Sequence, residues 1–244
     1  MSQSFGIVEE KLRETEFFLD ALRETKQLSF EAKWHFSAFV SAARSLTLAM
    51  QATMEGVDGF PEWYEQVQSG LKLDPLARFF IEIRNDSIHK GLNPLGQVTL
   101  EHLRDDLLRQ MHQRRRSHVI IMPNPGQGDG TVLADAVEVS SEYFRSLVQI
   151  VFDCYSRFRQ VVDPQWYFTQ GSFGARGKGL EDALEELGFP RTWLSGALDG
   201  EINQEDAWRV LRSRQPTCLV NDIFQRHLGK TVPDPDSLVE NDPK

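Results

Sequence analysis

The sequence predicts a mainly α-helical protein: an up-and-down bundle of four or five helices with a β-hairpin insertion and a helical C-terminal extension. Apolar residues recur at helical spacing over most of residues 1–165. The helical spacing of apolar residues is interrupted only where two short runs rich in β-branched residues flank a turn rich in Gly and Pro, a pattern typical of a β-hairpin. With 40% hydrophobic and 26% charged residues, the composition is that of an ordinary globular protein.

The first two helices are expected over residues 5–26 and from about residue 30 to Met54. Ser29 is a suitable N-cap for the second helix, because its hydroxyl can accept a hydrogen bond from a free backbone N–H. Gly56 and Gly59 then end the helical pattern.

A short helix opened by Phe60 precedes a third main helix that begins at Asp74 and Pro75. Asp is a preferred N-cap and Pro is tolerated in the first helical turn, so this pair is a strong helix start. Gly91 ends the helix. Its expected inner face consists of Leu76, Phe80, Ile83 and Ser87.

The chain beyond this helix is expected to form one more helix, the hairpin and the last bundle helix. The extra helix, well formed or frayed, covers residues 100–113, and the hairpin covers about residues 118–139. The last bundle helix follows at residues 140–162 with a broad apolar stripe, and Pro164 stops it.

The C-terminal third is expected to be organised separately from the bundle of residues 1–165. Residues 166–179 are Gly-rich and are interpreted as a linker. Residues 180–231 contain short helical patterns, which form either a small helical domain or an arm packed on the bundle. Residues 232–244 are rich in Pro and Asp and are expected to be disordered.

Composition excludes several classes of protein. No window has the ~18 uninterrupted apolar residues of a membrane helix, so a cytoplasmic protein without membrane contact is expected. Two cysteines do not make a disulfide framework or a zinc site, and His102, His112 and His118 have no regular ligand spacing, so neither metal nor cofactor is expected. A net charge of −9 argues against broad non-specific binding of nucleic acid.

A cluster of polar residues closes the apolar helix that begins at Asp74. Asn85 and His89 are four residues apart and Asp86 and His89 three, so on a helix these side chains can meet. Arg84 lies five residues before His89 and diverges from it by roughly 140°. Imidazole transfers protons near neutral pH, and guanidinium binds phosphate oxygens. The alternative is a polar helix end, in which Asn85 and Asp86 cap or bridge and His89 stabilises the helix dipole.

The spacing of Arg84 and His89, with the polar Asn85 directly after the arginine, resembles the motif of the HEPN superfamily. These small helical bundles include RNA-cleaving components of toxin–antitoxin, abortive-infection and CRISPR systems. Residues 34–51 are similar to the small-residue-rich second helix of that family, and the resemblance covers about residues 5–165. The common form continues His-x-Tyr, whereas Lys90 and Gly91 follow His89 here, so regulation by modification of that tyrosine is not expected.

The resemblance implies a metal-independent endoribonuclease that cleaves RNA by attack of the 2′-OH at a composite site of a homodimer. Arg84 would stabilise the phosphorane, His89 would transfer protons, and Asn85 and Asp86 would position them. An antitoxin protein is an expected partner. The candidate contacts to the RNA backbone are Lys90, Arg114, Arg115 and Arg116, although the three arginines fit a solvated helix end equally well.

A second interpretation belongs to a different class. The same helices would form a non-catalytic HEPN-like binding or scaffold module in a toxin–antitoxin or defence complex, with the polar cluster as part of an interface. The acidic net charge and the absence of the tyrosine favour this interpretation.

Overall fold

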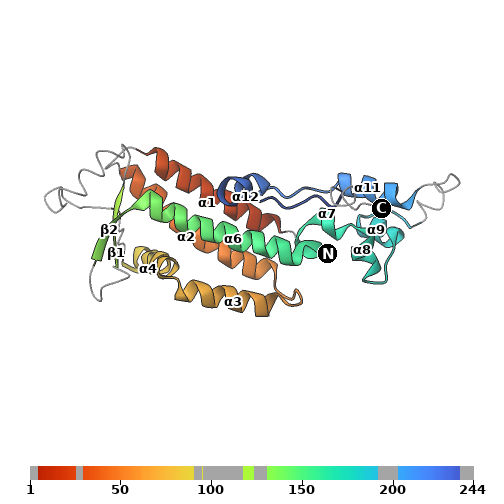
Figure 1. Cartoon of the computed structure of the whole chain (residues 1–244), viewed down its shortest axis with the longest axis horizontal. Coiled ribbons are helices and arrows are strands. Elements are labelled where there is room, and N and C mark those ends of the chain that lie inside the picture. Colours follow the sequence, from red (N-terminus) through yellow and green to blue (C-terminus); the bar gives the residue numbers. More distant parts are fainter. Residues whose placement is uncertain are drawn as a thin grey trace. The chain divides into compact units, whose positions relative to one another are not determined.

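The computed structural model describes residues 5–25, 30–90, 95, 118–123, 131–191 and 203–236, which are mainly helical as the sequence predicts (Figure 1). They divide into two compact units, one of residues 7–150 and one of residues 1–6 with 151–244, whereas a boundary near residue 165 was expected. The elements of the first unit are α1 (Gly6–Glu24), α2 (Phe30–Thr53), α3 (Phe60–Leu73), α4 (Pro75–Lys90), β1 (Val119–Pro123), β2 (Thr131–Asp135) and the beginning of α6 (Ala136–Val162).

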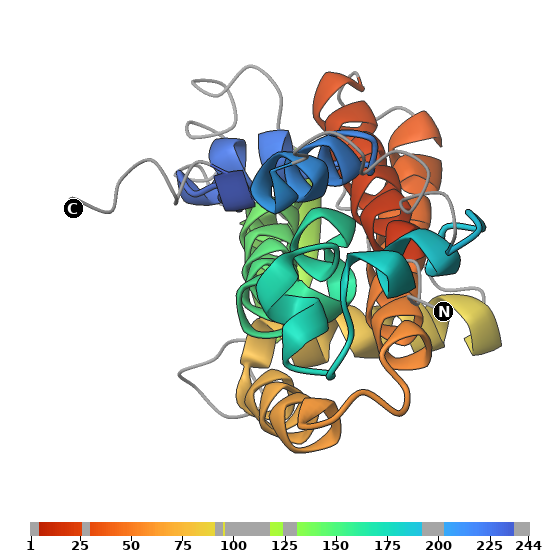
Figure 2. The same cartoon turned by 90° about the vertical axis from the view of Figure 1, so that its right-hand side faces the viewer.

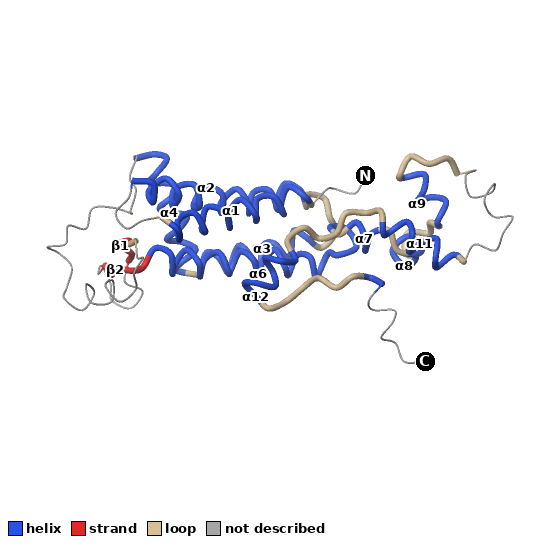
Figure 3. The backbone as a smooth tube through the Cα atoms, turned by 90° about the horizontal axis from the view of Figure 1, so that it is seen from above, coloured by secondary structure: helices blue, strands red, loops and turns tan. Residues whose placement is uncertain are grey.

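Three helices of the first unit supply the walls of its core. Helices α1, α2 and the first part of α6 run along a common direction (Figures 1 and 3). Each turns a stripe of apolar side chains inward at helical spacing, and their burial is the main favourable free energy of folding. The fully buried members of these stripes include Leu12, Leu19, Phe36, Phe39, Leu46, Phe144 and Leu147.

Helix α4 lies across these helices, in contrast to the expected up-and-down arrangement (Figure 2). A single extended residue, Asp74 (φ −72°, ψ 116°), separates α3 from α4, so the chain changes direction abruptly. The backbone N–H of Leu76 donates a 2.8 Å hydrogen bond to Asp74 Oδ1, which confirms Asp74 as the cap of α4.

The predicted hairpin is confirmed in its two strands, but its predicted end at about residue 139 is wrong. Strands β1 and β2 pair antiparallel, with Ile121 opposite Leu133. Residues 136–139, expected in the hairpin, belong to α6. The reason is Asp135, whose Oδ1 accepts hydrogen bonds from the N–H groups of Val137 (2.9 Å) and Glu138 (3.1 Å) and so starts the helix earlier.

The expectation of a linker at residues 166–179 is wrong, because this segment contains the end of α7 (Pro164–Tyr167) and all of α8 (Gln170–Gly174), and Phe168 and Phe173 are buried in it. The elements of this second unit that follow are α9 (Leu180–Glu186), α11 (Gln204–Ser213) and α12 (Asn221–Leu228). Asp163 caps α7 and Thr169 caps α8 through side-chain oxygens. The apolar cluster that holds them together consists of Phe168, Phe173, Ala183, Trp208 and Leu211.

Part of the expected disordered tail is also ordered. Trp166 Nε1 donates a 2.9 Å hydrogen bond to the carbonyl of Pro233, and Arg212 forms an ion pair with Asp236. The remainder of the tail, residues 237–244, lies outside the described residues, as does the helix expected at residues 100–113.

The two cysteines differ in accessibility, and this gives a first prediction. Cys154 is fully buried in α6, and desolvation raises the pKa of its thiol to about 12, whereas Cys218 is half-exposed. We expect a thiol-specific reagent at pH 8 to modify only Cys218 in the native protein, because the reactive species is the thiolate. Modification of Cys154 is expected only after unfolding in urea. Two equally fast thiols in the native protein would contradict this packing of α6.

Candidate functional site

The polar end of α4 is held by the buried face of the same helix. Ala77, Phe80 and Ile83 are all buried, so the rotation of the helix about its axis is determined by packing. The ring of Phe80 stacks on Tyr143 with centroids 4.5 Å apart and planes 7° apart, and it also contacts Phe36 and Phe39 on α2. The side chains that follow therefore project from a well-supported helix.

The motif residues lie at the surface of the first unit. Asn85, His89 and Lys90 are exposed, and Arg84 and Asp86 are half-buried. Arg84 Nη1 donates a long hydrogen bond of 3.4 Å to Asn85 Oδ1. An exposed imidazole and an accessible guanidinium can both reach a bound ligand from solvent.

The expected meeting of Asp86 with His89 is replaced by another pairing. Lys90 Nζ donates to Asp86 Oδ1 over 2.8 Å, in an i,i+4 pair whose side chains are about half-exposed. Within the described part of the chain, no hydrogen bond or ion pair to His89 is present. In this arrangement Asp86 neutralises Lys90 and does not orient the imidazole.

A small depression between α2 and α4 adds polar groups beside Arg84. Its lining consists of Phe36, Ser37, Val40, Ser41, Ile83, Arg84 and Ser87. Ser37, Ser41 and Ser87 thus line the same depression as Arg84, and hydroxyl and guanidinium groups are both donors suited to an oxyanion. Sequence reasoning missed both serines of α2. Their spacing of four residues places them on one face of that helix, and this was the available signal.

One chain does not bring the motif together as a complete acid–base site. Arg84 lines the depression toward α2, whereas His89 is five residues further along the helix and exposed. Five residues correspond to roughly 140° of rotation about the helix axis. A phosphate held by Arg84 would therefore need a second proton donor or acceptor from elsewhere.

The remaining candidates contribute little to this site. Arg114, Arg115 and Arg116 lie outside the described residues. His118 is buried, and its Nε2 lies 3.2 Å from the carbonyl oxygen of Thr25, a structural contact. Among the described residues there is no group of three or more His, Cys, Asp or Glu side chains placed to hold a metal ion. No helix in that part of the chain is long and apolar enough to cross a membrane.

In comparisons with known proteins, no family model, no curated protein and no solved structure matches the chain significantly.

Proposed function

We propose that the chain is a metal-independent endoribonuclease of HEPN type that works as a homodimer in the cytoplasm. One observation carries the proposal. The well-supported end of α4 presents the Arg84 guanidinium, in a depression that three serines also line, and five residues later an exposed imidazole. These are the groups that RNA cleavage requires when no metal takes part.

The reaction is a transesterification at phosphorus. His89 of one protomer takes the proton from the 2′-OH, and the 2′-oxygen attacks the adjacent phosphate while Arg84 neutralises the charge on the phosphorane. The bond from phosphorus to the 5′-oxygen breaks, and a second imidazole donates the proton that this oxygen takes up. The products are a 2′,3′-cyclic phosphate and a 5′-hydroxyl. DNA lacks the 2′-OH and is inert.

The homodimer follows from the need for two proton-transferring groups. A two-fold axis that brings two α4 ends together places both His89 side chains in one groove. Asn85 accepts from Arg84 and keeps the guanidinium oriented. Lys90 contacts RNA phosphate once its pair with Asp86 opens, and an antitoxin protein would inhibit by covering this end of α4.

A second candidate function is a non-catalytic binding or scaffold module in a toxin–antitoxin or defence complex. The pairing of Asp86 with Lys90 favours it, because an imidazole without a carboxylate partner is less well positioned for catalysis. A net charge of −9 favours it as well.

The test is an incubation of the purified protein in EDTA with RNA and DNA oligonucleotides of matched sequence. The expected result is cleavage of RNA alone, with 2′,3′-cyclic phosphate ends identified by mass spectrometry. Cleavage of DNA, or loss of RNA cleavage on adding EDTA, would contradict the mechanism. Inert RNA across a panel of structured and single-stranded substrates would favour the scaffold module.

A further inference from the structure

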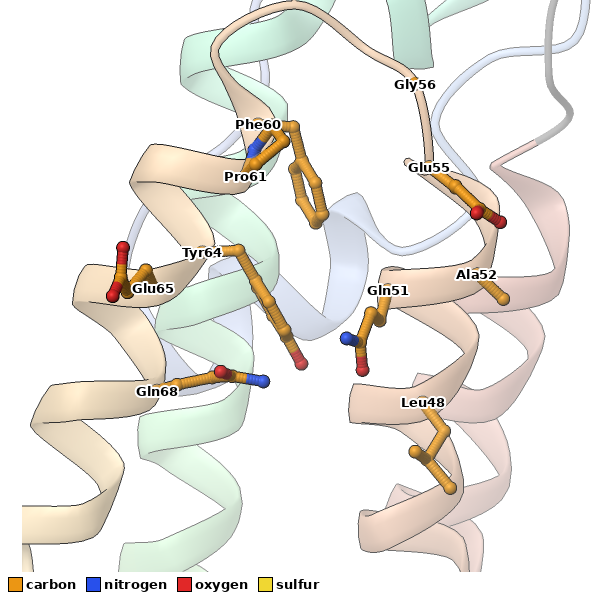
Figure 4. A pocket seen from close by; sticks show the side chains of 10 residues that line it. All are labelled: Leu48, Gln51, Ala52, Glu55, Gly56, Phe60, Pro61, Tyr64, Glu65 and Gln68. Carbon is orange, nitrogen blue, oxygen red and sulfur yellow. The ribbon is translucent and has the colours of Figure 1, made fainter.

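The groove between α2 and α3 of the first unit has a floor that is already packed. Figure 4 shows Phe60 and Tyr64 directed into the space between the two helices. Their rings are stacked with centroids 5.1 Å apart, and the two residues are only 3% and 6% exposed. The Tyr64 hydroxyl donates a 2.9 Å hydrogen bond to the carbonyl of Thr47 on α2. This floor leaves little apolar surface for a partner to bury.

Residues 230–236 of the second unit form a strap, which runs from α12 toward α7 and α11 and is held by side chains of these helices (Figure 1). Asn221 binds both backbone groups of Val232: its Nδ2 donates to the carbonyl over 3.3 Å, and its Oδ1 accepts from the N–H over 2.7 Å. Trp166 Nε1 donates a 2.9 Å hydrogen bond to the carbonyl of Pro233. Protein sites that recognise extended peptides use such bonds to the main chain for affinity, and add side-chain contacts for specificity.

Arg212 supplies the specific contact to the strap. Its guanidinium forms an ion pair with Asp236, although only 10% of the arginine side chain is exposed. The Nε of Arg212 is buried and has no hydrogen-bond partner among the described residues. Removing the anion from a buried guanidinium is strongly destabilising, because the charge is then left without compensation. An anion is therefore required at this position whenever the strap is displaced.

The groups that hold the strap are positioned by the rest of the second unit. The guanidinium carbon of Arg159 lies 4.1 Å from the ring centroid of Trp166, a cation–π contact that orients the indole. Arg212 and Asn221 belong to α11 and α12, whose apolar faces are buried. The site therefore does not depend on the strap for its own geometry.

The strap itself buries little surface. Four of its seven residues are exposed, and only Pro235 is buried. Segments with few buried apolar contacts open at a much lower free energy than the whole domain. We therefore expect the strap to leave its site while α7, α11 and α12 stay folded.

We propose that Trp166, Arg212 and Asn221 form a binding site for a segment of a partner protein, and that the strap occupies this site as an internal ligand in the free protein. The partner segment is an extended peptide with a proline and, three residues later, an Asp or Glu, as Asp236 follows Pro233. Proline restricts such a peptide to extended conformations, which lowers the entropy lost on binding. The strap competes at a high effective concentration because it is joined to α12, so it regulates access to the site.

The test uses a fluorescein-labelled peptide with the sequence of residues 230–236 and an amidated C-terminus. In a second peptide, asparagine replaces the final aspartate. Fluorescence anisotropy is expected to show that the aspartate peptide binds the Asp236→Ala variant at least about tenfold more tightly than the wild type, because the strap competes less for Arg212. The asparagine peptide should bind this variant about tenfold more weakly than the aspartate peptide. The matched variant Asp222→Ala removes an exposed aspartate from α12 and should change the affinity less than about threefold.

A second comparison tests the contact to the main chain. Adding Asn221→Ala to Asp236→Ala should weaken binding of the aspartate peptide about tenfold, because two hydrogen bonds to its backbone are lost. Gln225→Ala, at an exposed position one turn later on α12, should leave binding unchanged. Circular dichroism checks that all variants are folded. Saturating aspartate peptide should raise the thermal unfolding midpoint of Asp236→Ala more than that of the wild type, because it returns an anion to Arg212.

Three results would overturn the proposal. The first is equal affinity of the wild type and Asp236→Ala for the aspartate peptide, or no binding to either. The second is equal binding of the two peptides. The third is a wild-type dimer that Asp236→Ala converts into monomers in sedimentation, which would identify exchange of the strap between two copies. None of the site residues lies on α4, so peptide binding and RNA cleavage are tested independently.

Discussion

The His89→Ala variant is expected to lose RNA cleavage by about 10²–10⁴-fold while its unfolding midpoint in urea stays that of the wild type. The imidazole is exposed, and its removal leaves no cavity in the core. If His89→Ala loses activity but keeps its stability, the lost activity is therefore attributed to the missing proton transfer by the imidazole. The measurement is the single-turnover rate of cleavage of one RNA substrate, beside an unfolding curve.

The neighbouring residue supplies a matched control. Lys90→Ala breaks the pair with Asp86 but keeps the imidazole, so the rate should fall less than about tenfold. Arg84→Ala should lower the rate of RNA cleavage by about 10²-fold or more. Arg84→Lys should restore only part of that rate, because lysine lacks the planar fork of the guanidinium. If His89→Ala and Arg84→Ala both cleave RNA as the wild type does, the assigned roles are wrong.

The Phe80→Ala variant is expected to lower the free energy of unfolding of the first unit by about 3–5 kcal/mol. Phe80 is 2% exposed and lies at the crossing of α4 with α2 and α6, where its ring contacts Phe36, Phe39 and Tyr143. Its removal leaves a cavity and breaks the stacking with Tyr143. Denaturant unfolding followed by circular dichroism measures the change.

Ile81→Ala is the control for this core position, because Ile81 is the next residue on α4 and is 36% exposed. The expected loss is about 1 kcal/mol or less, since much of that side chain already contacts water. Phe80→Ala should also reduce RNA cleavage, because the motif depends on the position of α4. A Phe80→Ala protein as stable as Ile81→Ala would show that the crossing of α4 with α2 is not as described.

Local patterns were sufficient to predict most helix positions. Asp74 and Pro75 start α4 through a hydrogen bond within the same turn, so no distant residue is needed. The start of α6 was misplaced by four residues, because a valine-rich run suits a strand as well as a helix. The side chain of Asp135 decides between them.

The candidate site was predictable only in part. The spacing of Arg84 and His89 on one helix follows from the sequence, but the partner of Asp86 does not. His89 at i+3 and Lys90 at i+4 are both within reach of its carboxylate, and the structure selects Lys90. The serines beside Arg84 come from α2, more than forty residues earlier, and only the crossing of the two helices brings them together.

The sequence by itself determined that this protein is mainly helical, where α2 and α4 lie, and which polar residues end α4, because these depend on side-chain periodicity and capping within a few residues. Only the tertiary structure decided that the Gly-rich segment after Asp163 is packed and not a linker. Phe168 and Phe173 are buried there by Trp208, which lies 35 to 40 residues further along the chain. The same holds for the groove between α2 and α3, whose walls depend on a hydrogen bond from Tyr64 to the preceding helix. Segments that are distant in the sequence bury apolar surface against each other without leaving a periodic pattern in the sequence. These contacts are therefore visible only in the tertiary structure.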